Sequence, residues 1–324
     1  MDIAIIAAGV LLVTLLSEVV IRESLALAKR FGWSGAFVGL SILSVGTSLP
    51  EIMTQIAGSL TILREPALFE TVSGLMLGSN IGSDIFQQNF VLPLVALIGG
   101  VTVARRRREE ELAGLIAASS LLWLFTLDGL LARWEGAVLA FSYLAYLVLL
   151  ARAERPSRAR QRPHTPWRHV VIALAVLGAS FAVMAIATIE VVAAAERLVS
   201  RLPVSASFFG IVVLGIATAL PELTTAMLSI LKGERGISTG VLIGSNITNP
   251  LLGLGLGSWL STYSVPSVVV LYDLPVKIAT AALIYVFVFR RLRLNRIEAI
   301  ALILLYFAYL LARQQFFPAD VRGV

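Results

Sequence analysis

The sequence has 324 residues, of which 58% are hydrophobic and 14% are charged, and its mean hydropathy is +0.88. These values exclude an ordinary soluble domain, so lipid is the expected solvent for most of the chain. The absence of cysteine excludes disulfides, thiolate metal sites and cysteine nucleophiles. The net charge of +6 arises from basic residues in short connections between apolar runs, which indicates membrane topology and not nucleic-acid binding.

Ten apolar runs are predicted to cross the hydrocarbon core of a bilayer, about 30 Å thick, as helices. In chain order they are 3–27, 36–63, 71–103, 112–127, 136–150, 170–195, 205–231, 238–260, 265–289 and 297–312. The first run lacks a preceding basic region and a following cleavage site, so we expect a retained span and no targeting peptide. Charged residues crowd the connection between the fourth and fifth runs, and merging these two would give nine spans. The predicted fold class is an all-α polytopic membrane protein.

Basic residues predict the orientation of these spans. They gather in alternate connections, and by the positive-inside rule that side is cytoplasmic. We therefore expect a multi-pass protein of the cell membrane with both termini outside the cytoplasm. The polar, basic and proline-bearing segment 152–169 is predicted to be a cytoplasmic linker between two halves, 1–151 and 170–324. Five spans in each half would give the halves opposite orientations, which predicts inverted repeats.

Two motifs occur once in each half. VGTSLPEIMT at 45–54 matches IATALPELTT at 216–225, with coincident Thr, Leu, Pro and Glu residues. SGLMLGSNI at 73–81 matches TGVLIGSNI at 239–247 position by position. Two matches in the same order indicate an internal duplication.

Each first motif places a proline and a glutamate deep in an apolar helix. Pro50 and Pro221 are predicted to break their helices in the middle of the membrane, because proline lacks a backbone donor and clashes with the preceding turn. Glu51 and Glu222 follow directly, and a carboxylate at the bilayer centre costs at least about 2.5 kcal/mol. Neither has a lysine or arginine partner in its own span. A bound cation or a proton is the expected neutralising partner, whereas a single Pro-Glu pair would be compatible with a kinked helix and a protonated carboxyl.

Oxygen donors lie close to both glutamates in the sequence. Thr47, Ser48 and Thr218 precede them by about one helical turn, and Asn249 lies on the eighth span. Calcium binds about six to eight oxygen ligands and needs no softer donor. The pattern favours an oxygen cage for a hard cation.

At these motifs the sequence resembles the cation/calcium exchanger superfamily, whose two α-repeats carry a GTSLPE-type and a GSNI-type segment. The resemblance implies two inverted five-helix repeats with broken helices at the centre, and it assigns α-repeat 1 to about 36–98 and α-repeat 2 to about 205–260. It also implies calcium binding by Glu51 and Glu222, with further ligands for calcium or sodium from Thr47, Thr218 and neighbouring carbonyls.

Several positions depart from the family pattern. Asn249 matches the second polar position of the second repeat, but the equivalent position of the first repeat is Ser83, followed at once by Asp84. Either a helix bulge brings Asp84 to the site, or the serine replaces an amide and changes the coupling ion. Ala219 stands where the first repeat has Ser48, so one hydroxyl ligand is missing. For Ser79 and Ser245 in the GSN segments, ligation and a role in packing remain equal alternatives.

Two further polar features fall within the apolar runs. Asp273 and Lys277 are four residues apart, and this spacing predicts a helical ion pair near a span end. Gln87, Gln88 and Asn89 form a polar patch that is expected to face the interior of the bundle.

The sequence therefore predicts a secondary active antiporter that exchanges Ca²⁺ against Na⁺ or H⁺ by alternating access, with no prosthetic group and no enzymatic activity. Lipid and the transported cations are its expected partners, and a monomer would suffice. An intramembrane enzyme that depends on the two carboxylates and a cation channel are the alternatives.

Overall fold

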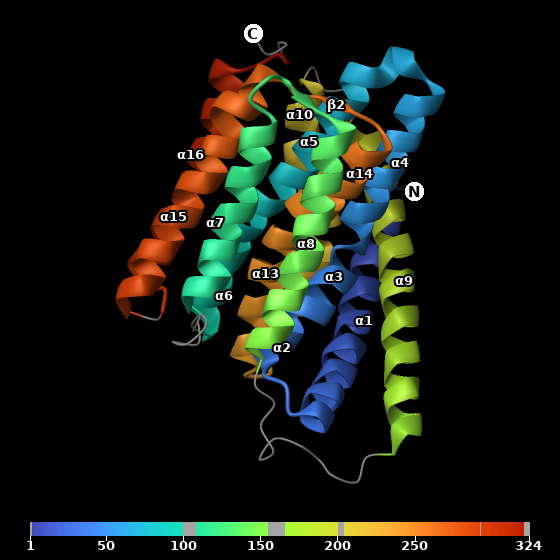
Figure 1. Cartoon of the computed structure of the whole chain (residues 1–324), viewed down its shortest axis with the longest axis vertical. Helices are drawn as coiled ribbons and strands as arrows, with labels where there is room; N and C mark the ends of the chain where they lie inside the picture. Colours follow the sequence, from blue (N-terminus) through green and yellow to red (C-terminus); the bar gives the residue numbers. More distant parts are fainter. Residues whose placement is uncertain (1, 100–107, 155–165, 200–203, 292, 321–324) are drawn as a thin grey trace.

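The computed structural model describes residues 2–99, 108–154, 166–199, 204–291 and 293–320, and most of these residues are helical (Figure 1). The helices of the first half are α1 Asp2–Phe31, α2 Gly35–Val38, η1 Gly39–Leu43, α3 Ser44–Thr47, α4 Leu49–Arg64, η2 Pro66–Leu68, α5 Phe69–Phe86, η3 Gln87–Val91, α6 Leu92–Gly99, α7 Arg108–Phe125 and α8 Arg133–Ala153. Two-residue strands β1, Leu130–Leu131, and β2, Tyr263–Ser264, form a small antiparallel ribbon.

The second half has a similar order of elements from α9 to α14 as the first half has from α1 to α6. Its helices are α9 Trp167–Val199, α10 Ala206–Phe209, η5 Gly210–Leu214, α11 Gly215–Thr218, α12 Leu220–Leu231, α13 Arg235–Thr248, η6 Asn249–Leu254, α14 Gly255–Leu260, η7 Val269–Asp273, α15 Leu274–Arg291 and α16 Arg296–Phe316. In both halves a π-helical segment, η1 or η5, directly precedes the short helix that carries the threonine of the first motif. Each predicted apolar run coincides with helical structure, although the end of the third run and most of the predicted linker lie outside the described residues.

Among the described residues, six helices are long and apolar enough to cross a membrane, and the number rises to eight if each of two bent helix pairs is one span. The fourth predicted run is a shorter apolar helix, Leu112–Phe125. Large apolar side chains such as Leu149, Leu174 and Leu304 are exposed on the outer helices. A surface of this kind is suited to lipid, and the protein is a multi-pass membrane protein.

Both predicted helix breaks are present. The axis bends by 40° between Gly35–Thr47 and Leu49–Arg64, and by 45° between Ala206–Thr218 and Leu220–Leu231. Each break lies two residues before the proline, where Ser48 and Ala219 have ψ angles of 6° and 3°. The proline then occupies the first turn of the following helix, where its missing N–H is not needed.

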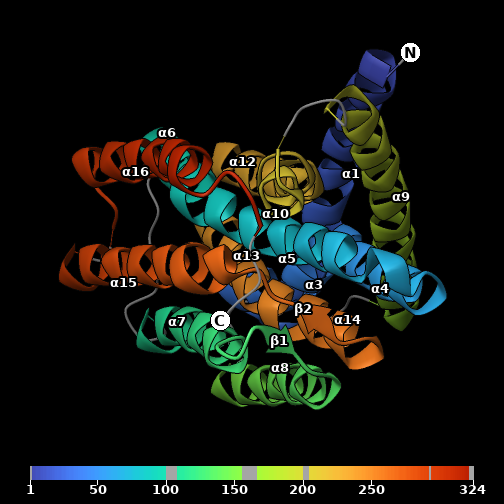
Figure 2. The same cartoon turned by 90° about the horizontal axis from the view of Figure 1, so that it is seen from above.

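At the centre of the molecule, helices of each half pack against the broken helix of the other half. Helix α5 packs against α10, η5 and α11, and α13 packs in the corresponding way against α2, η1 and α3. Figure 2 shows α5 and α13 in the middle, α1 and α9 side by side at one edge, and α7, α8, α15 and α16 on the opposite side. Each broken helix is therefore held by an unbroken helix of the other half.

Glycine permits this close approach. A Cβ atom on Gly82 of α5 would lie 2.4 Å from the Cα of Ile211, and one on Gly240 of α13 would lie 3.0 Å from the Cα of Gly39. Since the neighbouring atoms belong to helix backbone, a side chain cannot be accommodated without separating the helices.

The predicted ion pair between Asp273 and Lys277 is wrong. Asp273 instead pairs with Arg313 of α16, at 3.2 Å between Oδ1 and Nε, and it also accepts a hydrogen bond from Tyr309 at 2.9 Å. The guanidinium of Arg313 further contacts Ser207 and lies 3.6 Å from Asp320. Both members of the Asp273–Arg313 pair are fully buried. Packing of α16 against the rest of the bundle offers Asp273 a planar guanidinium, and this partner lies 40 residues away in the sequence.

Replacing Gly82 by alanine should lower the stability of the protein by about 1–3 kcal/mol, because the added methyl group meets the backbone of η5. Thermal unfolding of the detergent-purified protein measures the effect. Gly178→Ala is the matched control, since nothing lies within 4 Å of the corresponding Cβ position on α9. Equal melting temperatures for the two variants would contradict the packing role of Gly82.

Arg313→Met should destabilise the protein by about 3–5 kcal/mol, because it leaves the buried carboxylate of Asp273 without its partner. Lys232→Met serves as the control, since Lys232 pairs with Glu18 on the surface at 3.0 Å and exposed pairs contribute little. A melting temperature of Arg313→Met as high as that of the control would contradict the expected contribution of the buried ion pair to stability.

Candidate functional site

Glu51 and Glu222 lie at the third positions of α4 and α12, immediately after the two helix breaks. Glu51 is 1% exposed and Glu222 is 0% exposed, and their side chains are close enough to interact electrostatically. The first turn of a helix stabilises a carboxylate through its free N–H groups and the helix dipole. The two breaks thus bring two acidic helix N-termini together in the interior of the bundle.

Each glutamate accepts one hydrogen bond from a serine hydroxyl. Ser83 Oγ donates to Glu51 Oε1 at 3.0 Å, and Ser48 Oγ donates to Glu222 Oε1 at 3.1 Å. The second of these bonds connects the two halves, and Thr47 also interacts with the Glu222 carboxylate. These bonds hold one carboxylate oxygen of each glutamate and leave the other available.

Several oxygens of the site lack a hydrogen-bond partner among the residues that the structure describes. They are Glu51 Oε2, Glu222 Oε2, Ser79 Oγ, Asn80 Oδ1, Asn246 Oδ1 and Asn249 Oδ1, all of which are buried. Buried oxygens without donors are costly, and a hard cation is the ligand that satisfies them. Among the described residues there is no group of three or more His, Asp or Glu side chains arranged to hold a metal. The donor set therefore fits a cation bound by two carboxylates together with neutral oxygens.

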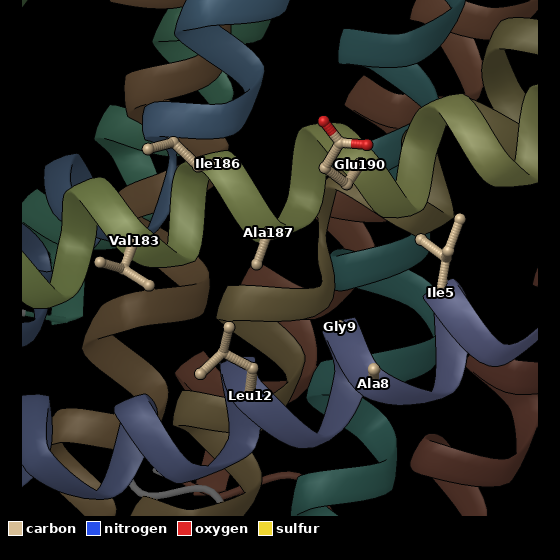
Figure 3. A pocket seen from close by; sticks show the side chains of 8 residues that line it. All are labelled: Ile5, Ala8, Gly9, Leu12, Val183, Ile186, Ala187 and Glu190. Carbon is tan, nitrogen blue, oxygen red and sulfur yellow. The ribbon is translucent and has the colours of Figure 1, made fainter.

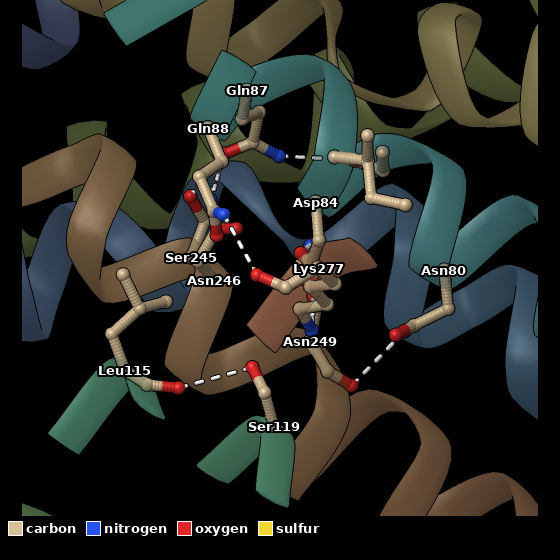
Figure 4. Close-up of polar contacts among 12 residues, drawn as sticks. Asn80, Asp84, Gln87, Gln88, Leu115, Ser119, Ser245, Asn246, Asn249 and Lys277 are labelled. Carbon is tan, nitrogen blue, oxygen red and sulfur yellow. Dashed lines mark hydrogen bonds and ion pairs between the residues drawn. The ribbon is translucent and has the colours of Figure 1, made fainter. Parts of the chain in front are cut away.

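Both carboxylate oxygens of Asp84 have partners. Its Oδ1 accepts a hydrogen bond from Asn249 Nδ2 at 2.9 Å, and its Oδ2 forms an ion pair with Lys277 Nζ of α15. Figure 4 shows Asp84 and Lys277 close together, and both side chains of this ion pair are 0% exposed. Of the two neighbouring residues, Ser83 hydrogen-bonds Glu51 and Asp84 pairs with a lysine.

The remaining residues of the predicted set are buried nearby and bond mostly to backbone. Thr47 and Thr218 donate to Leu43 O at 2.9 Å and Gly215 O at 3.4 Å. Ser245 Oγ donates to Val241 O at 2.8 Å and contacts Gln87 Oε1 at 2.5 Å. These bonds anchor the hydroxyl hydrogens, and the oxygen lone pairs remain free to accept.

The expected polar patch of Gln87, Gln88 and Asn89 is buried inside the bundle. Gln87 Nε2 donates to Ser83 Oγ at 3.0 Å. Gln88 Nε2 donates to the backbone oxygen of Lys277 at 2.9 Å, as Figure 4 shows. The patch therefore supports both the serine beside Glu51 and the lysine beside Asp84.

Sequence reasoning missed the connection of Lys277 to the site. A lysine inside an apolar run was a visible signal, but Asp273 at four residues' distance offered a simpler partner. The partner that the fold provides, Asp84, is 193 residues away.

A separate groove of about 440 Å³ opens between α1 and α9 (Figure 3). Gly9 and Leu12 line one side, Val183 and Ala187 line the other, and Glu190 is the only ionisable residue in its lining. None of the residues of the predicted site lines this groove, so it is distinct from the oxygen cluster.

Comparison with known proteins identifies the family to which this chain belongs. The model of the family described as sodium/calcium exchanger protein matches residues 1–152 and 172–314. The inner membrane protein YrbG of Escherichia coli is 30% identical over 263 residues, which are 78% of each protein. The putative antiporter CaxA of Alkalimonas amylolytica is 30% identical over 304 residues, covering 88% of this chain and 89% of CaxA.

A structure of the sodium-calcium exchanger NCX_Mj, soaked with 100 mM Na⁺ and 10 mM Sr²⁺, has the same fold, with a TM-score of 0.79. The identity is 22%, and the match covers 96% of this chain and 98% of the exchanger. The family match extends over both halves and therefore over both copies of the duplicated motifs. The chain belongs to the sodium/calcium exchanger protein family and is a membrane antiporter of the cation/calcium type.

Proposed function

We propose that the protein exchanges Ca²⁺ against Na⁺ or H⁺ at the oxygen cluster around Glu51 and Glu222. One observation carries this proposal: the two Pro-Glu breaks bring together two buried carboxylates, each with one oxygen held by a serine and the other oxygen unpaired. The proposed ligand set consists of these glutamates with Thr47, Ser48, Thr218, Ser79, Ser83 and Asn249. Ser245 and Asp84 adjoin it and shape it through their contacts with Gln87 and Asn249.

We further propose that ten membrane crossings form two inverted repeats, 1–151 and 170–324, joined by the basic segment 152–169. Support comes from the similar order of helices in α1–α6 and α9–α14, and from the reciprocal packing of α5 and α13 on the broken helices. Helix α8 ends and α9 begins at the lower end of the molecule in Figure 1. With the basic segment on the cytoplasmic side, both termini lie outside.

Competition for shared carboxylates couples the two fluxes in this proposal. An empty site leaves two negative charges in an apolar environment, and such a state is costly to move or occlude. Binding of one divalent ion or of monovalent ions removes that cost, so the loaded states are the ones that change access. Each direction of transport then requires its own cargo.

The two alternatives are less well supported. Relatives named as an antiporter or as an exchanger favour transport over catalysis. The carboxylates accept hydrogen bonds from serine hydroxyls, not from the acid, base and nucleophile groups that an intramembrane enzyme would need. A channel would show calcium flux without a counter-ion gradient, and this distinguishes it from the exchanger.

Uptake of radioactive calcium into vesicles tests the proposal, with an outward sodium gradient, an outward proton gradient or no gradient. Wild-type uptake should require one of the gradients. Glu51→Gln and Glu222→Gln should each lower it at least about a hundredfold, since the loss of one close charge pair costs several kcal/mol.

Glu190→Gln is the matched control, because Glu190 lies in the separate groove on α9 and its loss should leave uptake unchanged. Gradient-independent uptake by the wild-type protein, or full activity of both site variants, would overturn the proposed exchange.

Ser48→Ala should raise the calcium concentration needed for half-maximal uptake about tenfold. The variant removes the hydrogen bond that orients Glu222, and a bond to a charged group contributes about 1.5 kcal/mol or more. Ser142→Ala is the control, because Ser142 is half-buried on α8 and donates to Val138 O of its own helix at 2.8 Å. Equal half-maximal concentrations for wild type and Ser48→Ala would remove Ser48 from the site.

A further inference from the structure

At the centre of the protein, acidic side chains outnumber basic ones. Glu51 and Glu222 interact with each other, and Asp84 is close enough to interact electrostatically with both. Lys277 is the basic residue paired with this group, through Asp84. The other fully buried pair in the described residues, Asp273–Arg313, forms its own network with Tyr309 and Ser207. Three carboxylates against one ammonium leave two net negative charges at the centre.

Only the first half has an acidic residue at the position of Asp84. The aligned motifs read GSNIGSD at 78–84 and GSNITNP at 244–250, so Ser83 corresponds to Asn249 and Asp84 corresponds to Pro250. The second half thus contributes no acidic counterpart. A third carboxylate is present in the transport region, and a lysine from α15 is bound to it.

The structure holds Lys277 firmly against Asp84. Both side chains are 0% exposed, which excludes competition by water for the ammonium. Gln88 Nε2 donates to the backbone oxygen of Lys277 at 2.9 Å and contacts Thr280 Oγ1 one turn later at 2.5 Å, so η3 is clamped to α15 at this position. Asn249 Nδ2 occupies the other oxygen of Asp84 at 2.9 Å. The Lys277 ammonium therefore neutralises Asp84, and neither carboxylate oxygen of Asp84 is free to bind a transported cation.

We propose that Lys277 is a tethered cation of the transport site, which fills the place that a further monovalent ion would take at Asp84. This inference rests on the proposed exchange function. A loaded site changes access readily when its charge is close to zero, because net charge is costly in an apolar environment. Two remaining negative charges match one divalent ion or two monovalent ions. Lys277 thus makes the exchange electroneutral.

The dependence of transport on membrane potential tests this proposal. Wild-type protein and variants are reconstituted into vesicles, and calcium accumulation is driven by the outward gradient of the counter-ion that supports uptake. The potential is clamped at 0 or −100 mV. Each net charge moved per cycle changes the final accumulation ratio up to about fifty-fold at 100 mV. The wild-type ratio should be the same at both potentials.

Lys277→Met frees Asp84 to take a third monovalent ion, so its accumulation ratio should shift by up to about fifty-fold between the two potentials. Asp84→Asn combined with Lys277→Met removes both charges and should restore exchange that is insensitive to potential. Lys232→Met controls for loss of a surface lysine and should behave as the wild type.

Several results would overturn the inference. They are a potential-dependent ratio in the wild type, an active Lys277→Met variant with an unchanged ratio, and a double variant whose ratio depends on potential. If Lys277→Met is inactive because its core carries an unpaired charge, the wild type and the double variant decide between the outcomes. Absence of gradient-driven uptake by the wild type at either potential would instead refute the proposed exchange itself, and the tethered-cation role with it.

Discussion

The cost of placing ionised groups inside an apolar bundle governs the organisation of this protein. Glu51 and Glu222 are almost completely buried, and neither has a basic partner among its hydrogen bonds. The fold offsets their cost with two helix N-termini, which lie where the chain bends at Ser48 and Ala219. One oxygen of each carboxylate is still unpaired. In the proposed function a cation completes this site, and the unpaired oxygens are the physical basis of the proposed ion exchange.

Close approach of backbones is the second requirement, because hydroxyl groups reach the carboxylates only across a helix interface. Gly82 and Gly215 lie where α5 crosses η5 and α11, and a Cβ on Gly215 would come within 2.6 Å of Ser83 N. The backbone of Ser83 lies at this interface, and its hydroxyl donates to Glu51 of α4. Small residues at these crossings therefore decide which oxygen atoms lie near the proposed ion site, although they provide no ligand themselves.

Duplication followed by divergence explains why the two halves of the site differ. Ala219 lacks the hydroxyl that Ser48 supplies at the equivalent position. Ser48 bonds to Glu222 of the other half, and Glu51 receives its hydrogen bond from Ser83 of α5. Each glutamate therefore has one hydroxyl donor despite the missing serine. The Asp84–Lys277 pair is a second asymmetric feature and adds equal and opposite charges to one side of the centre.

The apolar helices, the helix breaks next to Pro50 and Pro221 and the burial of the two glutamates could be predicted from the amino-acid sequence alone. These features follow from local physics: hydropathy over one span, the missing N–H of proline, and the cost of charge in lipid. The family could be predicted as well, because each duplicated motif is a short, unbroken stretch of sequence that can be recognised without the fold.

Only the tertiary structure decided which charged groups pair. Asp273 and Lys277 have the spacing of a helical ion pair, yet Asp273 bonds to Arg313, 40 residues away, and Lys277 to Asp84, 193 residues away. A helical pair of this spacing contributes only about 0.2–0.5 kcal/mol, whereas an unpaired buried charge costs about 3–5 kcal/mol. Partners on neighbouring helices therefore prevail, and helix packing, which the local pattern does not encode, selects them.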